Sequence, residues 1–395
     1  MNSTPFLRYL IVGMFLLCCI FSSTAQTDIV DVAERLFHRN FRSPADTENI
    51  QPGKLLYAVV PGIGYSLQTS FDVVTTMNIS FYSGQPKTTN LSAITFIPEY
   101  AIFNQQVILP LAYNIWTPNN KWDIMGDIRY YKYPSYTYGL GPNTTVNQQD
   151  LIDYSYIRVY QSFMRHITSK FYAGLGYNLD YHWNITPESD LTHFQAYNAG
   201  ATQTTSSGIV LNTVYDERVN QNNPQGGFYA NLAFRLNTTL LGSDKNWNSL
   251  FVEFRKYVKP FKGSNSILAF WSWNYFTFGG SAPYFDLPST TWDTYSNLGR
   301  GYIQGRLRGP SLVYLESEFR FDILHNGLLG GVVFVNGQAV TNWPGNTMRW
   351  NNLLPGEGVG LRIKLNKYSK VNFCIDYGFG NEGSQGFFLN VAEVF

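Results

Sequence analysis

Apolar and polar residues alternate along this 395-residue chain in segments of about ten residues, the length of one tilted strand across an outer membrane. In the segment 71–81, one face carries Phe71, Val73, Thr75, Met77, Ile79 and Phe81, and the other carries Asp72, Thr76, Asn78 and Ser80. Successive residues of a β-strand point to opposite faces of the sheet, so a period of two is that of a strand. The pattern predicts an all-β chain that forms a transmembrane β-barrel, with apolar side chains facing lipid and polar side chains facing the lumen.

The final segment, 385–395, repeats this pattern and ends on an aromatic residue. Phe387, Leu389, Val391 and Phe395 share one face, which Glu393 interrupts. We expect this segment to form the last strand of the wall. Its aromatic end is also where the outer-membrane assembly machinery of the cell would recognise the chain as a client.

The alternation predicts sixteen antiparallel strands, at 54–66, 71–82, 90–101, 106–117, 120–132, 151–163, 170–182, 207–217, 226–237, 248–258, 266–278, 311–322, 327–336, 356–366, 369–379 and 385–395. An even number places both ends of a single-chain barrel on the periplasmic side. The long connections 133–150, 183–206, 279–310 and 337–355 then lie outside the cell, and the short connections 218–225, 259–265 and 323–326 lie in the periplasm. This asymmetry is typical of bacterial outer-membrane barrels.

The first 25 residues have the features of a secretory signal peptide. Arg8 precedes the apolar stretch 9–21, and the small residues 23–25 offer a cleavage site. Cys18 and Cys19 leave a lipoprotein anchor as an alternative, although neither follows the small residue that lipidation requires. We therefore expect export to the outer membrane of a Gram-negative-type bacterium, where lipid surrounds the barrel.

Residues 26–53 are predicted to form a short periplasmic segment before the barrel domain, which covers 54–395. Within this segment, 28–42 could form an amphipathic helix with Val32, Leu36 and Phe37 roughly on one face. The helix could be an ordered tail near the barrel mouth, a plug in the lumen or a docking element for a partner.

Cysteine, charge and histidine usage exclude several classes of function. Once 1–25 is removed, Cys374 is the one cysteine left, so no intramolecular disulfide can form. The formal net charge of +1 gives no electrostatic basis for binding nucleic acid. The histidines are scattered, and no motif joins one to a nucleophile or to a set of metal ligands. We therefore expect neither an enzyme nor a metal or cofactor site.

One stretch combines charged residues with turn-forming residues. It reads Tyr215-Asp216-Glu217-Arg218-Val219-Asn220 and continues, after Gln221 and Asn222, as Asn223-Pro224-Gln225-Gly226-Gly227-Phe228. Pro224 and the glycine pair suit a tight reversal, because glycine adopts positive φ at little steric cost. Asp216 and Arg218 share a strand face and could form an ion pair, either as a solvated pair or in a functional role.

A second stretch places an arginine between glycines in the longest predicted loop. It contains Gly299-Arg300-Gly301-Tyr302, then Gly305 and Gly309. The glycines allow a folded-in loop to bring Arg300 deep into the lumen, where a guanidinium needs carboxylate partners. Glu316, Glu318, Arg320 and Asp322 fall on the polar face of the following strand.

Together the two stretches resemble the bacterial surface antigen domain of the BamA/TamA family of outer-membrane assembly and translocation barrels. That family has an aspartate–arginine–asparagine turn ending in a Pro…Gly pair, and an Arg-Gly-aromatic motif at the tip of the loop between strands eleven and twelve. The loop 279–310 has this place in the predicted order. The resemblance covers 54–395 and implies a turn motif of Asp216, Arg218, Asn220, Pro224 and Gly227 and a loop motif of Arg300, Gly301 and Tyr302.

The resemblance also implies that loop 279–310 folds into the lumen and that Arg300 binds an acidic group on strands twelve to fourteen. The family often has an acidic residue in a Phe-Val-x-x-Gly segment of strand thirteen, whereas this chain has Phe334-Val335-Asn336. The expected acidic partners are therefore Glu318, Glu316 or Glu357.

The function implied is protein assembly or translocation at the outer membrane. Family members carry periplasmic POTRA domains that receive client chains, and each is much longer than the segment 26–53. Client recognition would then depend on separate periplasmic or lipoprotein subunits. The alternative is a plugged barrel that transports or binds small solutes or surface ligands.

The junction of the first and last strands is a further candidate site, formed by Pro61, Gly62, Gly386 and Phe395. Proline cannot donate a ladder hydrogen bond, and glycine weakens a strand. A poorly paired junction suits a lateral gate, although simple bulging explains the same residues equally well.

Overall fold

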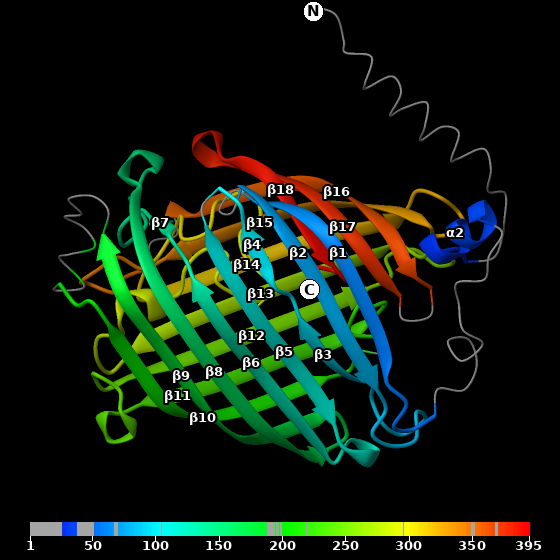
Figure 1. Ribbon diagram of the computed structural model, residues 1–395, viewed down its shortest axis with the longest axis horizontal. Coiled ribbons are helices and arrows are strands. Elements are labelled where there is room, and N and C mark those ends of the chain that lie inside the picture. The colour runs from blue at the N-terminus through cyan, green and yellow to red at the C-terminus, as the bar shows by residue number, and fades with distance from the viewer. Residues whose placement is uncertain are drawn as a thin grey trace, which may run out of the picture.

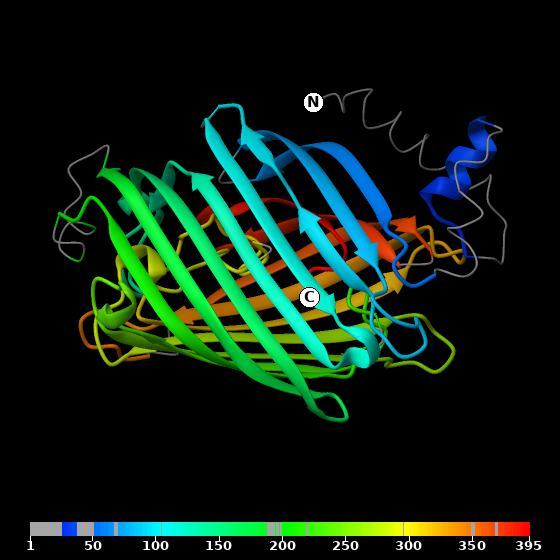
Figure 2. The same cartoon turned by 60° about the horizontal axis from the view of Figure 1, so that its bottom comes forward.

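The computed structural model describes residues 26–37, 51–66, 70–103, 105–187, 194, 197, 200–218, 220–294, 296–348, 352–367 and 370–395. These residues form an antiparallel β-barrel, shown from two sides in Figures 1 and 2. The predicted all-β fold class is confirmed. The predicted signal peptide, 1–25, and the second part of the predicted helix 28–42 lie outside the described residues.

The described residues form eighteen strands, and each strand makes antiparallel pairs with strands close to it along the chain. They are β1 (Leu56–Ser66), β2 (Ser70–Phe81), β3 (Ser92–Phe96), β4 (Glu99–Ala101), β5 (Gln106–Trp116), β6 (Trp122–Lys132), β7 (Ser135–Thr137), β8 (Asp150–Thr168), β9 (Phe171–Pro187), β10 (Thr204–Asp216), β11 (Gly227–Asn237), β12 (Trp247–Val258), β13 (Ile267–Phe278), β14 (Ser311–Asp322), β15 (Leu329–Val340), β16 (Leu354–Asn366), β17 (Val371–Gly380) and β18 (Gln385–Val391). The first and last strands, β1 and β18, lie near each other.

The structure has eighteen strands rather than the predicted sixteen because two segments of the wall are interrupted. The predicted strand 90–101 is divided into β3 and β4, which both pair with β2 on one side and β5 on the other. Pro98, which cannot donate a ladder hydrogen bond, lies in this break. The short strand β7 follows β6 after Tyr133 and Pro134, and both pair with β8. Part of the predicted outer loop 133–150 therefore extends the wall.

Alternate residues of the strands form an apolar outer face and a polar inner face. On β11, Leu232, Phe234 and Leu236 are 46%, 36% and 47% exposed, whereas Asn231, Arg235 and Asn237 are buried. The buried charges are paired, since Arg235 Nη1 donates to Asp180 Oδ2 on β9 at 2.6 Å. The barrel thus presents the apolar exterior and polar interior that a membrane-spanning wall requires.

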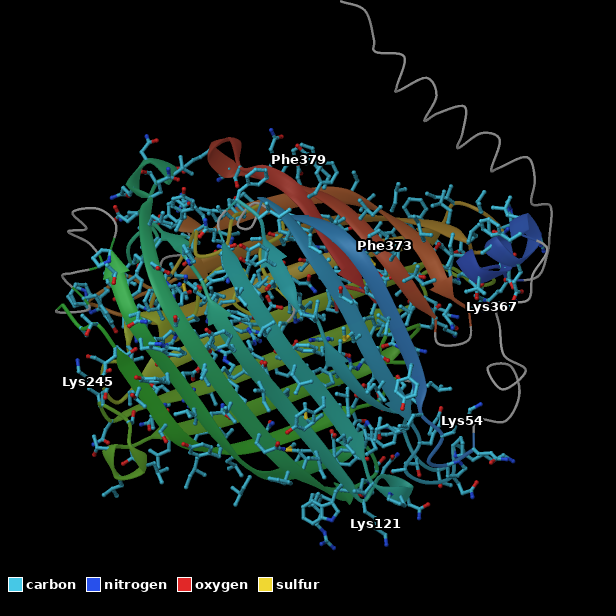
Figure 3. All side chains as sticks on the ribbon, viewed as in Figure 1. Lys54, Lys121, Lys245, Lys367, Phe373 and Phe379 are labelled. Atoms are coloured by element: carbon cyan, nitrogen blue, oxygen red, sulfur yellow. The ribbon has the colours of Figure 1, made fainter. Side chains whose placement is uncertain are left out.

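The two ends of the barrel differ in the length of their connections. We call one end the turn rim; it contains the connections 82–91, 117–121, 169–170, 217–226, 259–266, 323–328 and 367–370. The other end is the loop rim, and its longest connection is 279–310, between β13 and β14. In Figure 3, Lys54, Lys121 and Lys367 lie toward the turn rim and Lys245 lies at the loop rim.

The helix that the structure describes before the wall, α2 (Ile29–Phe37), is attached to the turn rim. Asp28 caps it, because Asp28 Oδ1 accepts from the N–H of Asp31 at 3.0 Å. The N–H of Thr27 donates to the carbonyl of Asn326 at 3.0 Å, and Lys367 Nζ lies 2.9 Å from Asp31 Oδ1. Residues 26–37 are therefore an ordered segment at the barrel mouth and not a plug in the lumen. Among the described helices, none has both the length and the hydropathy needed to cross a bilayer.

The final segment departs from the predicted strand 385–395. β18 ends at Val391, Ala392 has a φ of +80°, and the chain then turns into the barrel, where both views place its end. Phe395 is buried against Trp271, with ring centres 5.2 Å apart. The reason is Glu393, because continuing the strand would carry its carboxylate to the lipid-facing side. Turning inward places it beside arginines instead.

Candidate functional site

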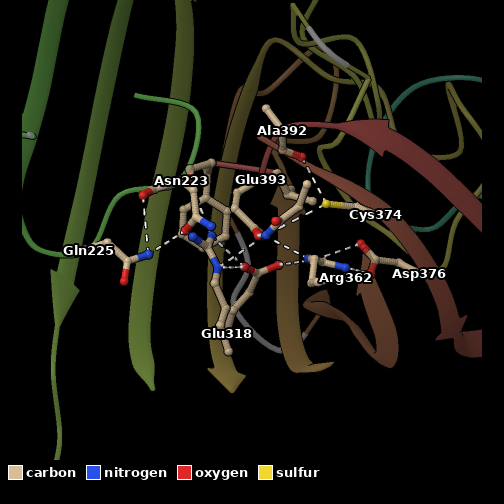
Figure 4. Close-up of polar contacts among 12 residues, drawn as sticks. Asn223, Gln225, Glu318, Arg362, Cys374, Asp376, Ala392 and Glu393 are labelled. Atoms are coloured by element: carbon tan, nitrogen blue, oxygen red, sulfur yellow. Dashed lines mark hydrogen bonds and ion pairs between the residues drawn. The ribbon is translucent and has the colours of Figure 1, made fainter. Parts of the chain in front are cut away.

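Seven charged residues meet inside the barrel where loop 279–310 approaches the wall. We call them the lumen cluster: Arg300 from the loop, Glu316, Glu318 and Arg320 from β14, Arg362 from β16, Asp376 from β17 and Glu393 after β18. Their side chains are at most 7% exposed. Three cations face four carboxylates, so the cluster is nearly neutral. Figure 4 shows the part formed by Glu318, Arg362, Asp376 and Glu393.

Arg300 is the centre of this cluster. Its Nη1 donates to Asp376 Oδ2 at 2.5 Å, and its Nη2 donates to Glu316 and Glu318. The guanidinium carbon lies 3.7 Å from the ring centre of Phe334 on β15. Contacts to several carboxylates and to a ring face use the planar, multiply donating guanidinium, which a lysine ammonium could not replace.

The charges around Arg300 stabilise its cationic form. Burial alone would lower the pKa of Arg300, but Glu316, Glu318 and Asp376 outweigh burial and raise that pKa well above its ordinary value. The cation and the carboxylates stabilise each other in the buried site. Removing one partner of a buried ion pair typically costs about 3–5 kcal/mol of folding stability. The cluster therefore holds the loop inside the lumen.

Gly301 and Tyr302 bring the loop tip against the wall. Gly301 has a φ of +105°, and a Cβ at this position would lie 2.6 Å from the carbonyl oxygen of Phe379 on β17. Glycine alone fits this approach without strain. The hydroxyl of Tyr302 accepts from the N–H of Asn381 at 2.8 Å, and Ser384 Oγ donates to the carbonyl of Gly301 at 2.7 Å.

Of the three acidic partners expected for Arg300, the structure places Glu316 and Glu318 in contact with it and Glu357 elsewhere. Glu357 on β16 is exposed, because it has the opposite strand parity to the buried Arg362. The expectation for Glu357 was therefore wrong. Asp376, the third partner, was not anticipated, although it shares the polar face of β17 with Asn372.

The terminal segment, residues 392–395, completes the cluster. Arg362 Nε donates to Glu393 Oε2 at 2.8 Å, and Asn372 Nδ2 donates to its Oε1 at 2.7 Å. Burial disfavours the charged form of Glu393, but Arg362 and Arg320 outweigh burial and lower the pKa of this carboxyl. Arg320 Nη2 also donates to the carbonyl of Phe395 at 3.0 Å.

The terminal segment also contacts the loop and a turn. Asn297 Nδ2 of loop 279–310 donates to the carbonyl of Val394 at 3.1 Å. The N–H of Glu393 donates to the carbonyl of Asn222, in the turn 217–226, at 2.8 Å. Figure 4 shows Asn223 and Gln225 of this turn next to the cluster. Loop, turn and terminal segment, which are far apart in sequence, thus form one polar network.

The turn motif itself is buried rather than solvated. Arg218 Nη2 and Asp216 Oδ2 are 2.9 Å apart, their side chains are 8% and 9% exposed, and the guanidinium lies over the Tyr229 ring at 4.2 Å. Asn220 Oδ1 accepts from the N–H groups of Asn222 and Asn223, both at 2.9 Å. Gly227 has a φ of +102°, and a Cβ there would lie 2.7 Å from the carbonyl oxygen of Glu217. Pro224 lies between these two features, in the turn itself.

A second contact holds loop 279–310 on the opposite side of the lumen. The ring of Phe285 stacks on Tyr154 of β8 with centres 4.2 Å apart, and Asp286 Oδ2 accepts from Ser206 Oγ of β10 at 2.5 Å. We call this contact the aromatic anchor. The aromatic anchor contacts the barrel wall at β8 and β10, whereas the lumen cluster contacts the wall from β14 to β17. Sequence reasoning missed it, because its tyrosines and phenylalanines resemble ordinary wall residues.

The residues of the predicted seam are placed in different environments. Pro61 and Gly62 are paired with Thr75 and Val74 of β2, and Gly386 is paired with Gly378 of β17. Phe395 lies in the lumen and not in the wall, so it does not face β1.

Solved structures provide the comparison for this architecture. BamA from Haemophilus ducreyi lacking POTRA domains 1–3 matches 85% of this chain and 70% of that chain, with a TM-score of 0.54 at 14% sequence identity. This chain has an outer-membrane β-barrel fold. CdiB from Acinetobacter baumannii is similar to the same degree, with a TM-score of 0.54 at 12% identity over 86% of this chain and 60% of CdiB. No family model and no curated protein matches.

At these identities the likeness shows the fold. It agrees with the apolar outer face of the strands in suggesting an outer-membrane location. The chain spans 60% of the length of CdiB.

Proposed function

We propose that this barrel acts in protein assembly or translocation at the outer membrane and works with separate subunits that recognise its clients. The observation that carries the proposal is loop 279–310, which lies in the lumen with Arg300 bound to carboxylates of β14 and β17. The resemblance of the loop and turn motifs to assembly and translocation barrels supports it, as does the fold likeness to BamA and CdiB.

The occupied lumen favours this function over steady diffusion of solutes. The loop is held by the lumen cluster on one side and by the aromatic anchor on the other. A barrel crossed in this way is better suited to work through its wall or its rims than through a permanent aqueous path.

Depletion of the protein followed by quantitative outer-membrane proteomics tests the proposal. We expect other barrel proteins to be lost from the membrane and to be restored by the wild-type chain. Arg300→Ala should fail to restore them, while Lys245→Ala, an exposed change at the loop rim, should succeed. An unchanged proteome after depletion would refute the proposal and favour the transport or binding alternative.

A further inference from the structure

The lysines of this barrel are distributed very unequally between its two ends. Ten of the twelve lie at the turn rim: Lys54, Lys87, Lys121, Lys170, Lys256, Lys259, Lys262, Lys364, Lys367 and Lys370. The other two, Lys132 and Lys245, lie at the loop rim. Figure 3 labels members of both groups. The long connections are at the loop rim, so loop length does not explain the bias.

The lysines of the turn rim form an incomplete ring. Lys54 lies just before β1. The others lie in the turns 82–91, 117–121, 169–170, 259–266 and 367–370 or near the ends of the strands that these turns join. Two turns lack lysine, and both contact other parts of the chain. Turn 217–226 accepts a hydrogen bond from Glu393, and turn 323–328 accepts one from Thr27.

Most of these lysines have no carboxylate partner within the described residues. Lys367 is the member with an ion pair there, to Asp31 of α2. Among the described residues, the carboxylates at this rim that are at least partly exposed are Asp31, Glu34, Asp216, Glu217, Asp322 and Glu393. Of these, Asp216 and Glu393 are paired with Arg218 and Arg362. The arginines of the wall, by contrast, are mostly inside the lumen and paired. The turn rim therefore carries a net positive charge that the described chain does not neutralise.

The position of Lys256 shows which surface the ring faces. It shares the outer face of β12 with the exposed Phe254, and its Nζ lies 5.9 Å from the ring centre of Phe228. The aliphatic part of this lysine follows the lipid-facing surface, and its ammonium group reaches the rim. The ammonium group therefore lies at the level of the lipid headgroups. Leu36 of α2, which is 68% exposed, lies at the same rim, so the surface combines cationic and apolar groups.

We propose that the turn rim is a binding surface for anionic phospholipid headgroups of the periplasmic leaflet. Short turns face the periplasm in bacterial barrels, so this rim meets that leaflet. The lysines are distributed around the rim, and lipid headgroups surround the barrel on all sides. A protein partner, by contrast, would contact only part of the rim. The proposal does not depend on the assembly role.

Lipid enrichment around the purified full-length barrel tests the proposal. The barrel is reconstituted in bilayers of phosphatidylcholine with a minor fraction of phosphatidylglycerol, and its retained lipid is quantified by mass spectrometry. The attraction of a single lysine to an anionic membrane corresponds to about a fivefold enrichment. We expect enrichment of phosphatidylglycerol of at least this order at low salt, falling as salt is added.

Matched variants locate the effect. A variant with Lys87, Lys121, Lys170, Lys259 and Lys262 changed to Gln should lose a large part of the phosphatidylglycerol enrichment, and the five lysines that stay at this rim account for the remainder. The control, Lys132→Gln with Lys245→Gln, should behave as wild type. Circular dichroism and a heat-dependent change in gel mobility confirm that each variant is folded. Equal loss in both variants would overturn the proposal. No enrichment in the wild type would also overturn it and would assign the ring to an acidic protein.

Discussion

Arg300 shows how a single buried cation can determine the position of a loop. Its guanidinium binds Glu316, Glu318 and Asp376, all three of them fully buried, whereas the other ion pair of the loop on this side, Arg306 with Glu382, has a carboxylate that is 41% exposed. We expect Arg300→Ala to leave the barrel folded and to free loop 279–310, since three carboxylates would lose their cation at a cost of about 3–5 kcal/mol. Protease added outside intact cells should then cut the loop more readily.

Arg306→Ala is the matched control for this measurement. Arg306 lies in the same loop and binds Thr144 and one carboxylate, Glu382, which is 41% exposed, so its loss should free the loop less than the loss of three buried carboxylate contacts. Equal cleavage of wild type and Arg300→Ala would contradict the role assigned to Arg300.

Asp286 in the aromatic anchor gives the loop a dependence on pH. Burial, and then the neighbouring Asp180, raises the pKa of Asp286 to about 8. Since an unfolded aspartate has a pKa of about 3.9, the stability due to the neutral acid is complete below about pH 4 and is lost as pH rises through about 8. We expect Asp286→Asn to raise the unfolding temperature at about pH 9 and to change it little at about pH 4.

The exposed Asp244 provides the comparison for that titration. Asp244→Asn should leave the pH dependence of the unfolding temperature as in the wild type. If Asp286→Asn followed the wild-type curve throughout, Asp286 would not be the titrating group.

The partners in a buried contact could be predicted from sequence where a residue lies between glycines or on the polar face of a strand. Arg300 lies between glycines, and Glu316 and Glu318 lie on the polar face of a strand, so both sides of this contact could be named. Asp376 could not be named as a partner, because its proximity depends on how far the loop reaches across the lumen. No local pattern encodes that distance.

The terminal segment is the element whose behaviour differs most from its sequence pattern. Cys374 on β17 is buried beneath it, with Sγ 3.0 Å from the carbonyl of Ala392. We expect Glu393→Gln to release the segment, because Arg362 and Arg320 lose a charged partner worth on the order of 1.5–3 kcal/mol. Labelling of Cys374 by maleimide in the folded barrel should then accelerate about tenfold or more.

Two controls separate release of the segment from general unfolding. Cys374→Ser should abolish labelling, and Glu382→Gln, a change at the exposed turn 381–384, should label at the wild-type rate. Unchanged labelling of Glu393→Gln would show that Glu393 does not hold the segment.

Strands were predictable as elements because each one repeats the same two-residue pattern. The exceptions have identifiable causes. Pro98 divides one predicted strand, and Glu393 and the positive φ of Ala392 end another. For the terminal segment the sequence contained a signal, since a carboxylate interrupted an apolar face. Its destination was not predictable, because Arg320 and Arg362 come from β14 and β16.

For the whole molecule, the occupied lumen predicts a low conductance. In planar bilayers the wild-type barrel should show low, flickering conductance, because loop 279–310 crosses the lumen. A variant in which a short Gly-Ser linker replaces 290–306 should give larger and steadier openings. The replaced segment lies between Ser289 and Arg308, which form a β-bridge that the variant keeps. A large steady conductance of the wild type would contradict the occupied lumen.

The sequence predicts the overall architecture of the molecule, but it does not predict the contacts that cross the lumen. A barrel fold and a long loop at one place in the strand order follow from alternation and motifs. The aromatic anchor and the contact of turn 217–226 with residue 393 depend on the curvature of the wall. A one-dimensional pattern contains no information on which inner faces oppose each other.

Attachment of the loop at both sides has a mechanical consequence. A loop bonded to β8 and β10 at one side and to β14 and β17 at the other acts as a strut across the barrel and limits changes in its diameter. Widening of the wall would first strain the weaker of the two attachments. The order in which they break would therefore set the direction in which the barrel can deform.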